Sequence, residues 1–187
     1  MTDTTLETFL KTGAYLRGHF RLTSGLHSAE YLQSAKVLQN PNIAQQLAEE
    51  LVNRMPQGDV VASPAIGGLI IGHEVARAMG VPFIFTERDA DGKMALRRGF
   101  SVEPGQKFVV IEDVVTTGGS TREVIALLQS MGAEVLAAGS IVDRSGGSAD
   151  VGVPRVALTT LQPETWPADF CPLCQKGMPI EKPGSRK

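Results

Sequence analysis

The segment from Phe108 to Ser120 constrains the fold of this chain more than any other, because it contains a strand pattern and the loop that connects this strand to a helix pattern. Its first four residues are apolar and predict a short buried strand over Phe108–Ile111. The residues Thr121–Met131 carry apolar side chains at helical spacing and predict a helix. Between them, Glu112–Ser120 reads EDVVTTGGS and is expected to be a loop that begins with two acids. Since open α/β sheets bind ligands at the carboxyl ends of their strands, this loop is a predicted ligand site.

The residue types of this loop suit a phosphorylated sugar. Gly118 and Gly119 allow the backbone to approach an anion closely, and the free N–H groups of the following helix attract a phosphate. Glu112 and Asp113 repel a phosphate, so we expect them to accept hydrogen bonds from vicinal hydroxyls such as those of ribose. A ligand-free turn can also contain Gly and Thr, but it does not account for paired acids beside paired glycines. The hydroxyl donors expected around the phosphate are Thr116, Thr117, Ser120 and Thr121.

Strand and helix patterns alternate along the rest of the chain, which predicts an α/β fold with a central, mostly parallel sheet flanked by helices. Asn40 and Pro41 mark a helix start, because Asn is a favoured cap and Pro fits the first helical position. The charged segment Glu87–Lys93 has no apolar anchor and predicts a mobile loop. The other expected elements are a helix over Thr4–Lys11, two short strands around Ser24 and Gly25, strands near Asp59–Ala62, Val81–Phe85, Val135–Val142 and Arg155–Thr160, a helix that ends at Gly80, and an irregular tail beyond Pro163.

Composition argues against several classes of protein. The formal net charge of −2 predicts no broad basic surface, so nucleic acid is not an expected partner. No apolar run is long enough to cross a bilayer and the N-terminus is acidic, so neither a membrane span nor a secretory signal is expected. Cys171 and Cys174 have the spacing of half a zinc site. Because the histidines lie far away in sequence, we expect two reduced thiols and no bound metal, in a reducing cytoplasm.

The loop resembles the phosphoribosyl pyrophosphate signature of type I phosphoribosyltransferases, in which an apolar strand precedes two acids and a Thr/Gly-rich loop. The resemblance implies that Glu112 and Asp113 bind the ribose hydroxyls and that Thr116–Ser120 enclose the 5′-phosphate. It also implies the type I phosphoribosyltransferase fold over residues 1–187 as one domain, with a hood over about residues 1–40 and a tail over about residues 163–187. The implied substrate-binding residues after the acids are Val114, Val115, Thr116, Thr117, Gly118, Gly119 and Ser120.

A second resemblance narrows the substrate to orotate. GHFRLTSGLHSAEYLQ looks like the hood motif of orotate phosphoribosyltransferases, SPAIGG like their pyrophosphate loop, and IVDRSGG like the strand end whose Arg holds orotate. Arg144 suits this role because a guanidinium can grip the orotate carboxylate with two hydrogen bonds, and Thr116 matches a residue that contacts the ring edge. The alternative for Arg144 is a surface ion pair with Asp143 or Asp150. The matching hood positions are Phe20, Leu22, Ser24, Gly25, Ser28 and Tyr31.

The chain departs from this pattern mainly at its cations. Thr23 and Gly67 stand where many members of the family have Lys, and Asp89 replaces another Lys in the mobile loop. The loop also lacks the His that is common there. Cations of this loop must neutralise a leaving pyrophosphate, so Arg88 and Lys93 are the predicted catalytic residues. The possible substitutes are Arg97 and Arg98, and the alternative for all four is a solvated charged surface.

The implied activity is transfer of the phosphoribosyl group of 5-phosphoribosyl 1-diphosphate to orotate. The products are orotidine 5′-monophosphate and diphosphate, a step of de novo pyrimidine biosynthesis. The resemblance further implies Mg²⁺ bound mainly through the diphosphate substrate, and a homodimer, because the family's loop reaches the neighbouring subunit. Two alternatives are a purine phosphoribosyltransferase, which would lack the hood motif, and a regulator that senses phosphoribosyl pyrophosphate while binding nucleic acid.

Overall fold

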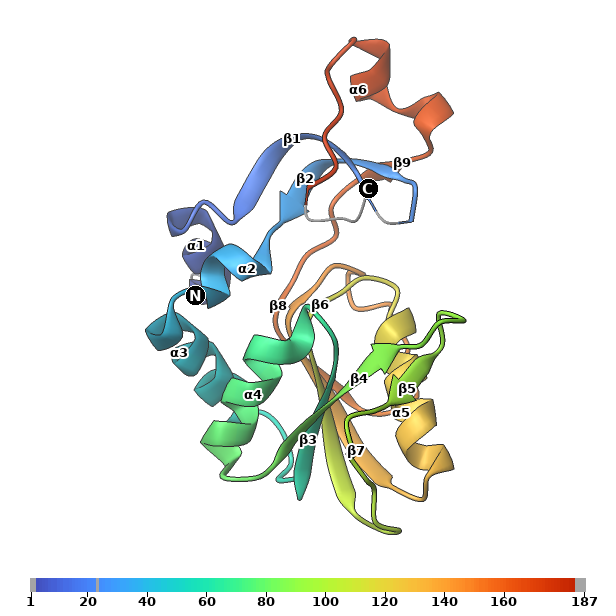
Figure 1. Cartoon of the computed structure of the whole chain (residues 1–187). Coiled ribbons are helices and arrows are strands. Elements are labelled where there is room, and N and C mark those ends of the chain that lie inside the picture. Colours follow the sequence, from blue (N-terminus) through green and yellow to red (C-terminus); the bar gives the residue numbers. More distant parts are fainter. Residues whose placement is uncertain (1–2, 23, 184–187) are drawn as a thin grey trace. The chain divides into compact units, whose positions relative to one another are not determined.

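The computed structural model describes residues 3–22 and 24–183, so Thr23 lies outside the described residues. The chain forms two compact units: residues 38–161 make the larger one, and residues 1–37 together with 162–187 make the smaller one (Figure 1). Among the described residues, no helix is both long and apolar enough to cross a membrane.

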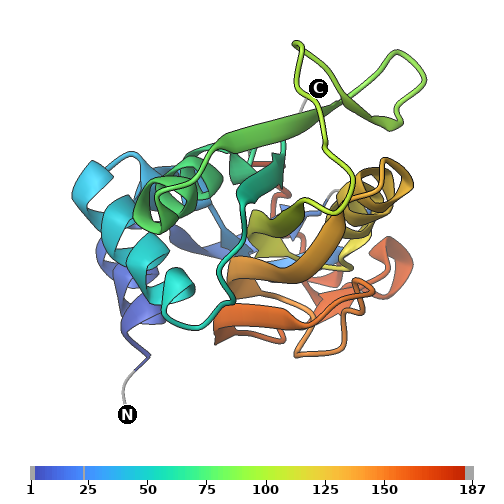
Figure 2. The ribbon, with the colours of Figure 1, turned by 90° about the horizontal axis from the view of Figure 1, so that it is seen from below.

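The larger unit is built on a six-stranded sheet with the strand order β5-β4-β3-β6-β7-β8. All neighbouring strands are parallel except β5, which pairs antiparallel with β4. Figure 2 shows α3 and α4 on one side of this sheet and α5 on the other. The elements are α3 (Pro41–Val52), β3 (Val60–Pro64), α4 (Gly68–Met79), β4 (Phe83–Arg88), β5 (Met94–Leu96), β6 (Lys107–Val115), α5 (Gly119–Ser130), β7 (Glu134–Asp143) and β8 (Arg155–Thr160).

Local signals explain where the helices of this unit begin and end. The side chain of Asn40 accepts hydrogen bonds from the N–H groups of Asn42 and Ile43, which caps α3 as predicted. Gly80 ends α4 in the left-handed conformation with φ of +72°, which glycine adopts without steric cost. Between the sheet and α5 lies an apolar core that includes Phe108, Val110, Val124, Ile125 and Leu128. This core fixes the start of α5 at the carboxyl end of β6.

The smaller unit contains a three-stranded antiparallel sheet with the order β1-β2-β9. The backbone N–H of Arg21 in β1 donates to the carbonyl of Glu181, so the tail also contacts this sheet through an isolated bridge at that residue. Its core includes the fully buried ring of Phe9. The elements are α1 (Thr4–Lys11), β1 (Tyr15–Arg21), β2 (His27–Leu32), β9 (Thr165–Trp166), the 3-10 helix η1 (Ala168–Phe170) and α6 (Pro172–Gln175), and α2 (Ser34–Leu38) precedes α3.

Three sequence predictions about local structure were wrong. The strand β6 continues to Val115, so Glu112 and Asp113 belong to a strand and not to a loop. The segment Glu87–Lys93 is not a simple loop, because Glu87 pairs with Ala95 in a β4–β5 hairpin. The tail beyond Pro163 forms β9, η1 and α6 and is therefore not wholly irregular. For β6 and β9, pairing with another strand outweighed the local composition, and the β4–β5 hairpin likewise depends on pairing between its two strands.

Candidate functional site

The two acids of β6 lie at the carboxyl end of the parallel sheet, where the predicted ligand site was expected. Glu112 is partly buried, and its carboxylate accepts a short hydrogen bond from the hydroxyl of Thr121 in α5. The pKa of the Glu112 carboxyl is raised from 4.5 to about 7, mainly because of burial and in smaller part because of the negative charge of Asp113. The Thr121 hydrogen bond and the positive charge of Arg88 lower this pKa but do not cancel the effect of burial. Glu112 therefore changes its charge near neutral pH.

The loop after β6 has the backbone geometry of an anion site. Gly118 has φ of +75° and precedes the first turn of α5, whose N–H groups have no side-chain cap. A Cβ atom at Gly118 would lie 2.8 Å from Cγ1 of Val151, so any larger residue would be strained and crowded there. The side chains of Thr116 and Thr117 are exposed beside this turn. Exposed hydroxyls and unpaired helix N–H groups together can bind a phosphate.

Some predicted residues of this loop contribute only through their backbone or not at all. The side chain of Val115 is buried in the core, whereas Val114 is partly exposed. The hydroxyl of Thr121 is fully buried and donates to Glu112, so the expectation that it contacts a phosphate was wrong. Thr121 lies on the buried side of α5, which faces β6, so its hydroxyl contacts Glu112 and not the open side of the loop. Gly119 and Ser120 form the first turn of α5, as an anion site at the helix N-terminus requires.

A second loop from β3 approaches the same acids. It follows Pro64, contains a cis peptide bond between Ala65 and Ile66, and leads into α4. A Cβ atom at Gly67 would lie 2.5 Å from an Oδ1 atom of Asp113. The absence of a side chain at Gly67 thus allows this loop, which resembles a pyrophosphate loop, to pass close to Asp113. A Lys at this position would require Asp113 to change its conformation.

Arg144 lies at the end of the neighbouring strand β7. Its backbone N–H donates to the carbonyl of Val115 at 2.7 Å, which brings it beside the start of the phosphate loop. The alternative partner Asp143 is occupied by other donors, including Arg155 at 2.9 Å and the hydroxyl of Ser145 at 2.6 Å. Burial raises the pKa of the Asp143 carboxyl, but the hydrogen bonds from Ser145 and Arg155 outweigh burial and hold this pKa below its usual value.

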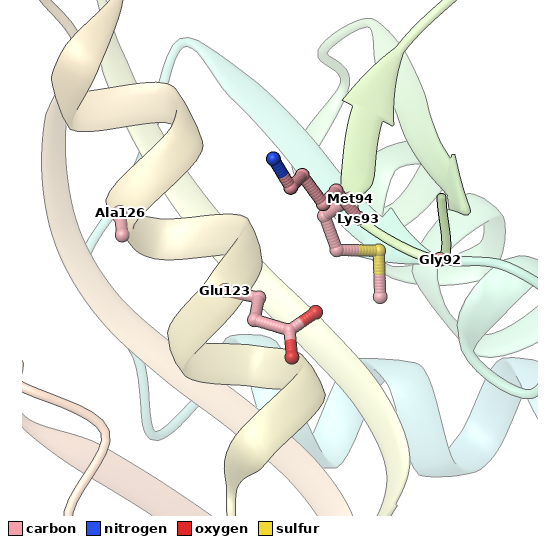
Figure 3. Close-up of a pocket in the computed structure, with 5 residues that line it drawn as sticks. All are labelled: Gly92, Lys93, Met94, Glu123 and Ala126. Carbon is pink, nitrogen blue, oxygen red and sulfur yellow. The ribbon is translucent and has the colours of Figure 1, made fainter. Parts of the chain in front are cut away.

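The two predicted catalytic cations, Arg88 and Lys93, lie in the β4–β5 hairpin, on either side of its turn and next to α5. Arg88 donates to the carboxylate of Glu123 at 2.8 Å and to the carbonyl of Gly92 at 2.5 Å. Lys93 lines a cavity of about 300 Å³, and Figure 3 shows its side chain and that of Glu123 extending into this cavity from opposite sides. The remaining lining residues are Gly92, Met94 and Ala126.

The alternative cation Arg98 is held differently. Its guanidinium makes two hydrogen bonds to Glu87, at 2.7 and 2.8 Å, and lies over the ring of Phe85. Arg88 is near enough to Glu112 to lower the pKa of that carboxyl, whereas Arg98 acts on Glu87. The geometry therefore favours Arg88 over Arg98 as a group of this site.

The hood motif of the smaller unit is largely a packing motif in this structure. Phe20 is buried and its ring lies 5.7 Å from that of Tyr31. The hydroxyl of Ser28 is buried and donates to the carbonyl of Glu164. Ser24 and Gly25, in contrast, are exposed at the hairpin turn, where Gly25 has φ of +85°. Of these motif residues, those at the turn are the ones available to a ligand.

Comparison with known proteins agrees with this geometry. The family model of the phosphoribosyl transferase domain matches residues 33–172. The chain belongs to the phosphoribosyl transferase family. It is 53% identical over 184 residues to the orotate phosphoribosyltransferase of Desulforamulus reducens, a match that covers 97% of this chain and 96% of that protein. The matched residues include the whole β6–α5 segment and the Arg144 strand end.

Solved structures show the same fold in relatives with different named substrates. The crystal structure of orotate phosphoribosyltransferase from Aeropyrum pernix has a TM-score of 0.71 and 29% identity, and the match covers 83% of this chain and 93% of that one. An adenine phosphoribosyltransferase from Thermoanaerobacter pseudethanolicus has a TM-score of 0.61 and 18% identity, with 71% and 88% covered. The similarity to the adenine phosphoribosyltransferase, at 18% identity, shows only a shared fold. The predicted fold class is therefore confirmed, but the fold does not determine which base is the substrate.

Sequence reasoning gave Thr121 the wrong partner, a phosphate, and did not identify Glu123 at all. Thr121 positions the Glu112 carboxylate, and Glu123 holds Arg88. Both lie in the first turns of α5, directly after the phosphate loop. A signal for Thr121 was present in principle, because a polar residue on the buried face of an amphipathic helix requires a hydrogen-bond partner. No local signal pointed to Glu123, since an exposed Glu on a helix is ordinary.

Proposed function

We propose that this protein transfers the phosphoribosyl group of 5-phosphoribosyl 1-diphosphate to orotate, forming orotidine 5′-monophosphate and diphosphate. The observation that carries the proposal is the 53% identity to a named orotate phosphoribosyltransferase over nearly the whole of both chains. The cradle formed by the β6 acids and the start of α5 suits a phosphorylated ribose, which is the part that 5-phosphoribosyl 1-diphosphate and orotidine 5′-monophosphate share.

In this proposal the two β6 acids accept hydrogen bonds from the ribose hydroxyls while the loop around Gly118 holds the 5′-phosphate. The pKa of Glu112 near 7 in the free protein gives this step a measurable consequence. Hydroxyl donors stabilise the ionised carboxylate, so binding lowers the pKa of Glu112 and releases protons near neutral pH. Asp113, beside Gly67, then lies between the ribose and the loop that resembles a pyrophosphate loop.

The chemical step is nucleophilic displacement at the anomeric carbon. The ring nitrogen of orotate forms a bond to this carbon as the bond to diphosphate breaks, through a transition state with oxocarbenium character, and the proton of that nitrogen passes to the departing diphosphate or to water. Arg144 orients orotate through its carboxylate, and Arg88 and Lys93 approach the leaving diphosphate. Arg88 must exchange its ion pair with Glu123 for one with the substrate, which couples loop position to ligand binding. Catalysis in this scheme is positioning and electrostatic stabilisation without a covalent enzyme intermediate.

The donor set also fits Mg²⁺, because Glu112 and Asp113 supply the carboxylate oxygens that this cation prefers. Magnesium carried mainly on the diphosphate neutralises charge on the leaving group when it is bound. The role of the chain itself is to hold the ribose beside the diphosphate. It also brings the positive side chains of Arg88 and Lys93 to the negatively charged diphosphate.

A homodimer is part of the proposal. Ile66 and Ile70 expose 76% and 48% of their surface at the start of α4. Ile70 also lines an open cavity of about 450 Å³ with Leu69, His73, Glu74, Phe83 and Phe85. Exposed apolar surface of this kind is typical of protein interfaces and suits a second copy of the chain. Light scattering can measure the molar mass of the unchanged protein and of Ile70→Asp, and we expect a dimer for the first and a monomer for the second. The same oligomeric state for both proteins would argue against this face as the interface.

The activity is tested by the loss of orotate absorbance in the presence of phosphoribosyl pyrophosphate and Mg²⁺. We expect turnover with orotate and none with adenine or guanine. Turnover of a purine without turnover of orotate would replace the proposal by a purine phosphoribosyltransferase. Binding of phosphoribosyl pyrophosphate without turnover of any base would favour the sensing regulator.

A further inference from the structure

Four side chains that can bind a metal meet in the smaller unit, and none of them has a role in the proposed reaction. They are His19, His27, Cys171 and Cys174, and their ligand atoms all lie within 4.8 Å of one another. His19 comes from β1, His27 from the start of β2, and the cysteines from the turn around α6. Sequence separation had argued against a second ligand pair near the cysteines, and that argument was wrong, because the tail folds back onto the β1–β2 hairpin. These four residues are called the His–Cys cluster.

The distances within the His–Cys cluster are those between ligands of one tetrahedral ion. The Nε2 atom of His19 lies 3.0 Å from Nδ1 of His27, 3.5 Å from Sγ of Cys171 and 3.7 Å from Sγ of Cys174. The Sγ atom of Cys174 lies 3.3 Å from Nδ1 of His27. A tetrahedral zinc ion with Zn–N near 2.0 Å and Zn–S near 2.3 Å separates its ligand atoms by about 3.3–3.8 Å. These four of the six ligand separations lie within a few tenths of an ångström of the tetrahedral values, and the other two are at most 4.8 Å, so a small ion fits after side-chain shifts of up to about 1 Å.

Hydrogen bonding among the four groups does not explain this convergence. The Nδ1 atom of His19 lies 2.9 Å from the carbonyl oxygen of Met178, which can only accept, so Nδ1 carries the proton. The Nε2 atom of a neutral His19 then has a single lone pair, yet three groups converge on it, from His27, Cys171 and Cys174. One lone pair satisfies one well-directed hydrogen, whereas one metal ion accounts for all of these contacts.

The surroundings of His19 are those of a metal ligand. Metal-bound imidazoles usually donate their second N–H to a carbonyl or carboxylate, as His19 does to Met178. His19 falls where the β1–β2 register shifts between Arg17 and Phe20, an irregularity of the kind that redirects a side chain. His19, His27 and Cys171 are buried and Cys174 is exposed, so three of the four ligands are screened from water.

We propose that the His–Cys cluster binds a structural Zn²⁺ ion that joins the C-terminal tail to the β1–β2 hairpin. Two thiolates and two imidazoles in a tetrahedral arrangement favour zinc over Mg²⁺ or Ca²⁺, which prefer oxygen ligands. Four protein ligands leave no open position for a substrate, so the ion stabilises the fold and takes no part in group transfer. The smaller unit needs such a link, because β9 has two residues and α6 has four.

The first test measures zinc in protein purified without added metal and without chelator. We expect about one zinc ion per chain, lost on exchange against a strong chelator under reducing conditions and regained from zinc chloride. Cobalt chloride added to the chelated protein should produce the visible absorption of a tetrahedral thiolate complex. These measurements use the unchanged sequence, so they remain decisive if a variant fails to fold.

The second test compares His27→Gln and Cys174→Ser with Lys107→Gln, a change at an exposed residue of β6 in the larger unit. The bound zinc of the two cluster variants should fall at least tenfold and their melting temperatures should fall, whereas Lys107→Gln should keep both its zinc and its melting temperature. Equal zinc in all three variants would identify an adventitious ion and overturn the proposal. It would equally be overturned by reduced wild-type protein that takes up no zinc, by stoichiometric iron in place of zinc, or by a Cys171–Cys174 disulfide that persists under reducing conditions.

Discussion

In the larger unit, the residues proposed to hold the phosphorylated ribose are contiguous from Glu112 to Ser120, on one strand, one turn and one helix start. In the smaller unit, the His–Cys cluster collects its side chains from β1, β2 and the tail, up to 155 residues apart. The first site leaves exposed hydroxyls and helix N–H groups for a ligand, whereas the second turns its ligand atoms toward one another. A site that must bind and release ligands leaves its polar groups open to molecules from solution. A site that joins segments of the chain brings side chains of those segments together.

The largest effect expected from a single change is on the leaving diphosphate. Lys93→Ala removes a cation from the cavity beside α5 and should lower kcat by about 100- to 1000-fold, as loss of one electrostatic contact to a transition state typically does. Binding of orotidine 5′-monophosphate, which has no diphosphate, should change far less. Lys107→Ala, an exposed Lys at the opposite end of β6, is the control. A wild-type kcat in Lys93→Ala would remove this residue from the mechanism, and zinc content should not change in either variant.

The second effect concerns the buried charge of Glu112. With a folded-state pKa near 7 and an ordinary value of 4.5, the folded protein keeps a proton on Glu112 that the unfolded chain loses between these pH values. Stability from this group is therefore fully present below pH 4.5 and declines as pH rises to about 7. Glu112→Gln removes this decline, so it should gain up to about 3 kcal/mol relative to wild type between pH 4.5 and 8.

The Glu112→Gln comparison is made by denaturant unfolding at pH 5 and pH 8. The Gln side chain keeps an oxygen that can accept from Thr121, so packing changes little. The same variant should bind phosphoribosyl pyrophosphate more weakly and release fewer protons on binding. A stability difference that is the same at both pH values would show that Glu112 is not the titrating group.

The third effect distinguishes binding of orotate from binding of phosphoribosyl pyrophosphate. Arg144→Lys keeps a positive charge but loses the two parallel hydrogen bonds of a guanidinium, and should raise the KM for orotate about tenfold. The KM for phosphoribosyl pyrophosphate should change less than twofold, because the change lies at the end of β7 and leaves the β6–α5 loop intact. Equal changes in both constants would place Arg144 in a structural role.

The smallest effect is expected at the hydrogen bond that supports Glu112. Thr121→Val keeps the shape of the side chain but removes the hydroxyl, so the pKa of Glu112 should rise further above 7. Above that pH the folded protein should lose about 1 kcal/mol of stability, the usual contribution of such a bond. Carbon NMR of labelled Glu can follow this titration directly. An unchanged pKa would mean that Thr121 does not act on Glu112 in solution.

Local sequence patterns predicted the parts of the fold that depend on short stretches of chain. Asn40 and Pro41 located the start of α3, and the apolar run from Phe108 located β6. The same patterns ended β6 too early, since two acids look like a loop until the parallel partner β7 continues the strand to Val115. The hairpin at Arg88 was missed for the same reason, because pairing with Met94 decides its conformation and local composition does not.

The sequence by itself determined the proposed phosphate cradle, because the strand, the acids, the turn glycines and the helix start are adjacent along the chain and interact locally. Only the tertiary structure decided the state of Glu112, because its pKa depends on burial and on a hydroxyl from the next helix. The meeting of His19 and His27 with the tail cysteines was likewise decided by the fold. Burial and contacts between distant segments are properties of the packed chain, and no short stretch of residues encodes them.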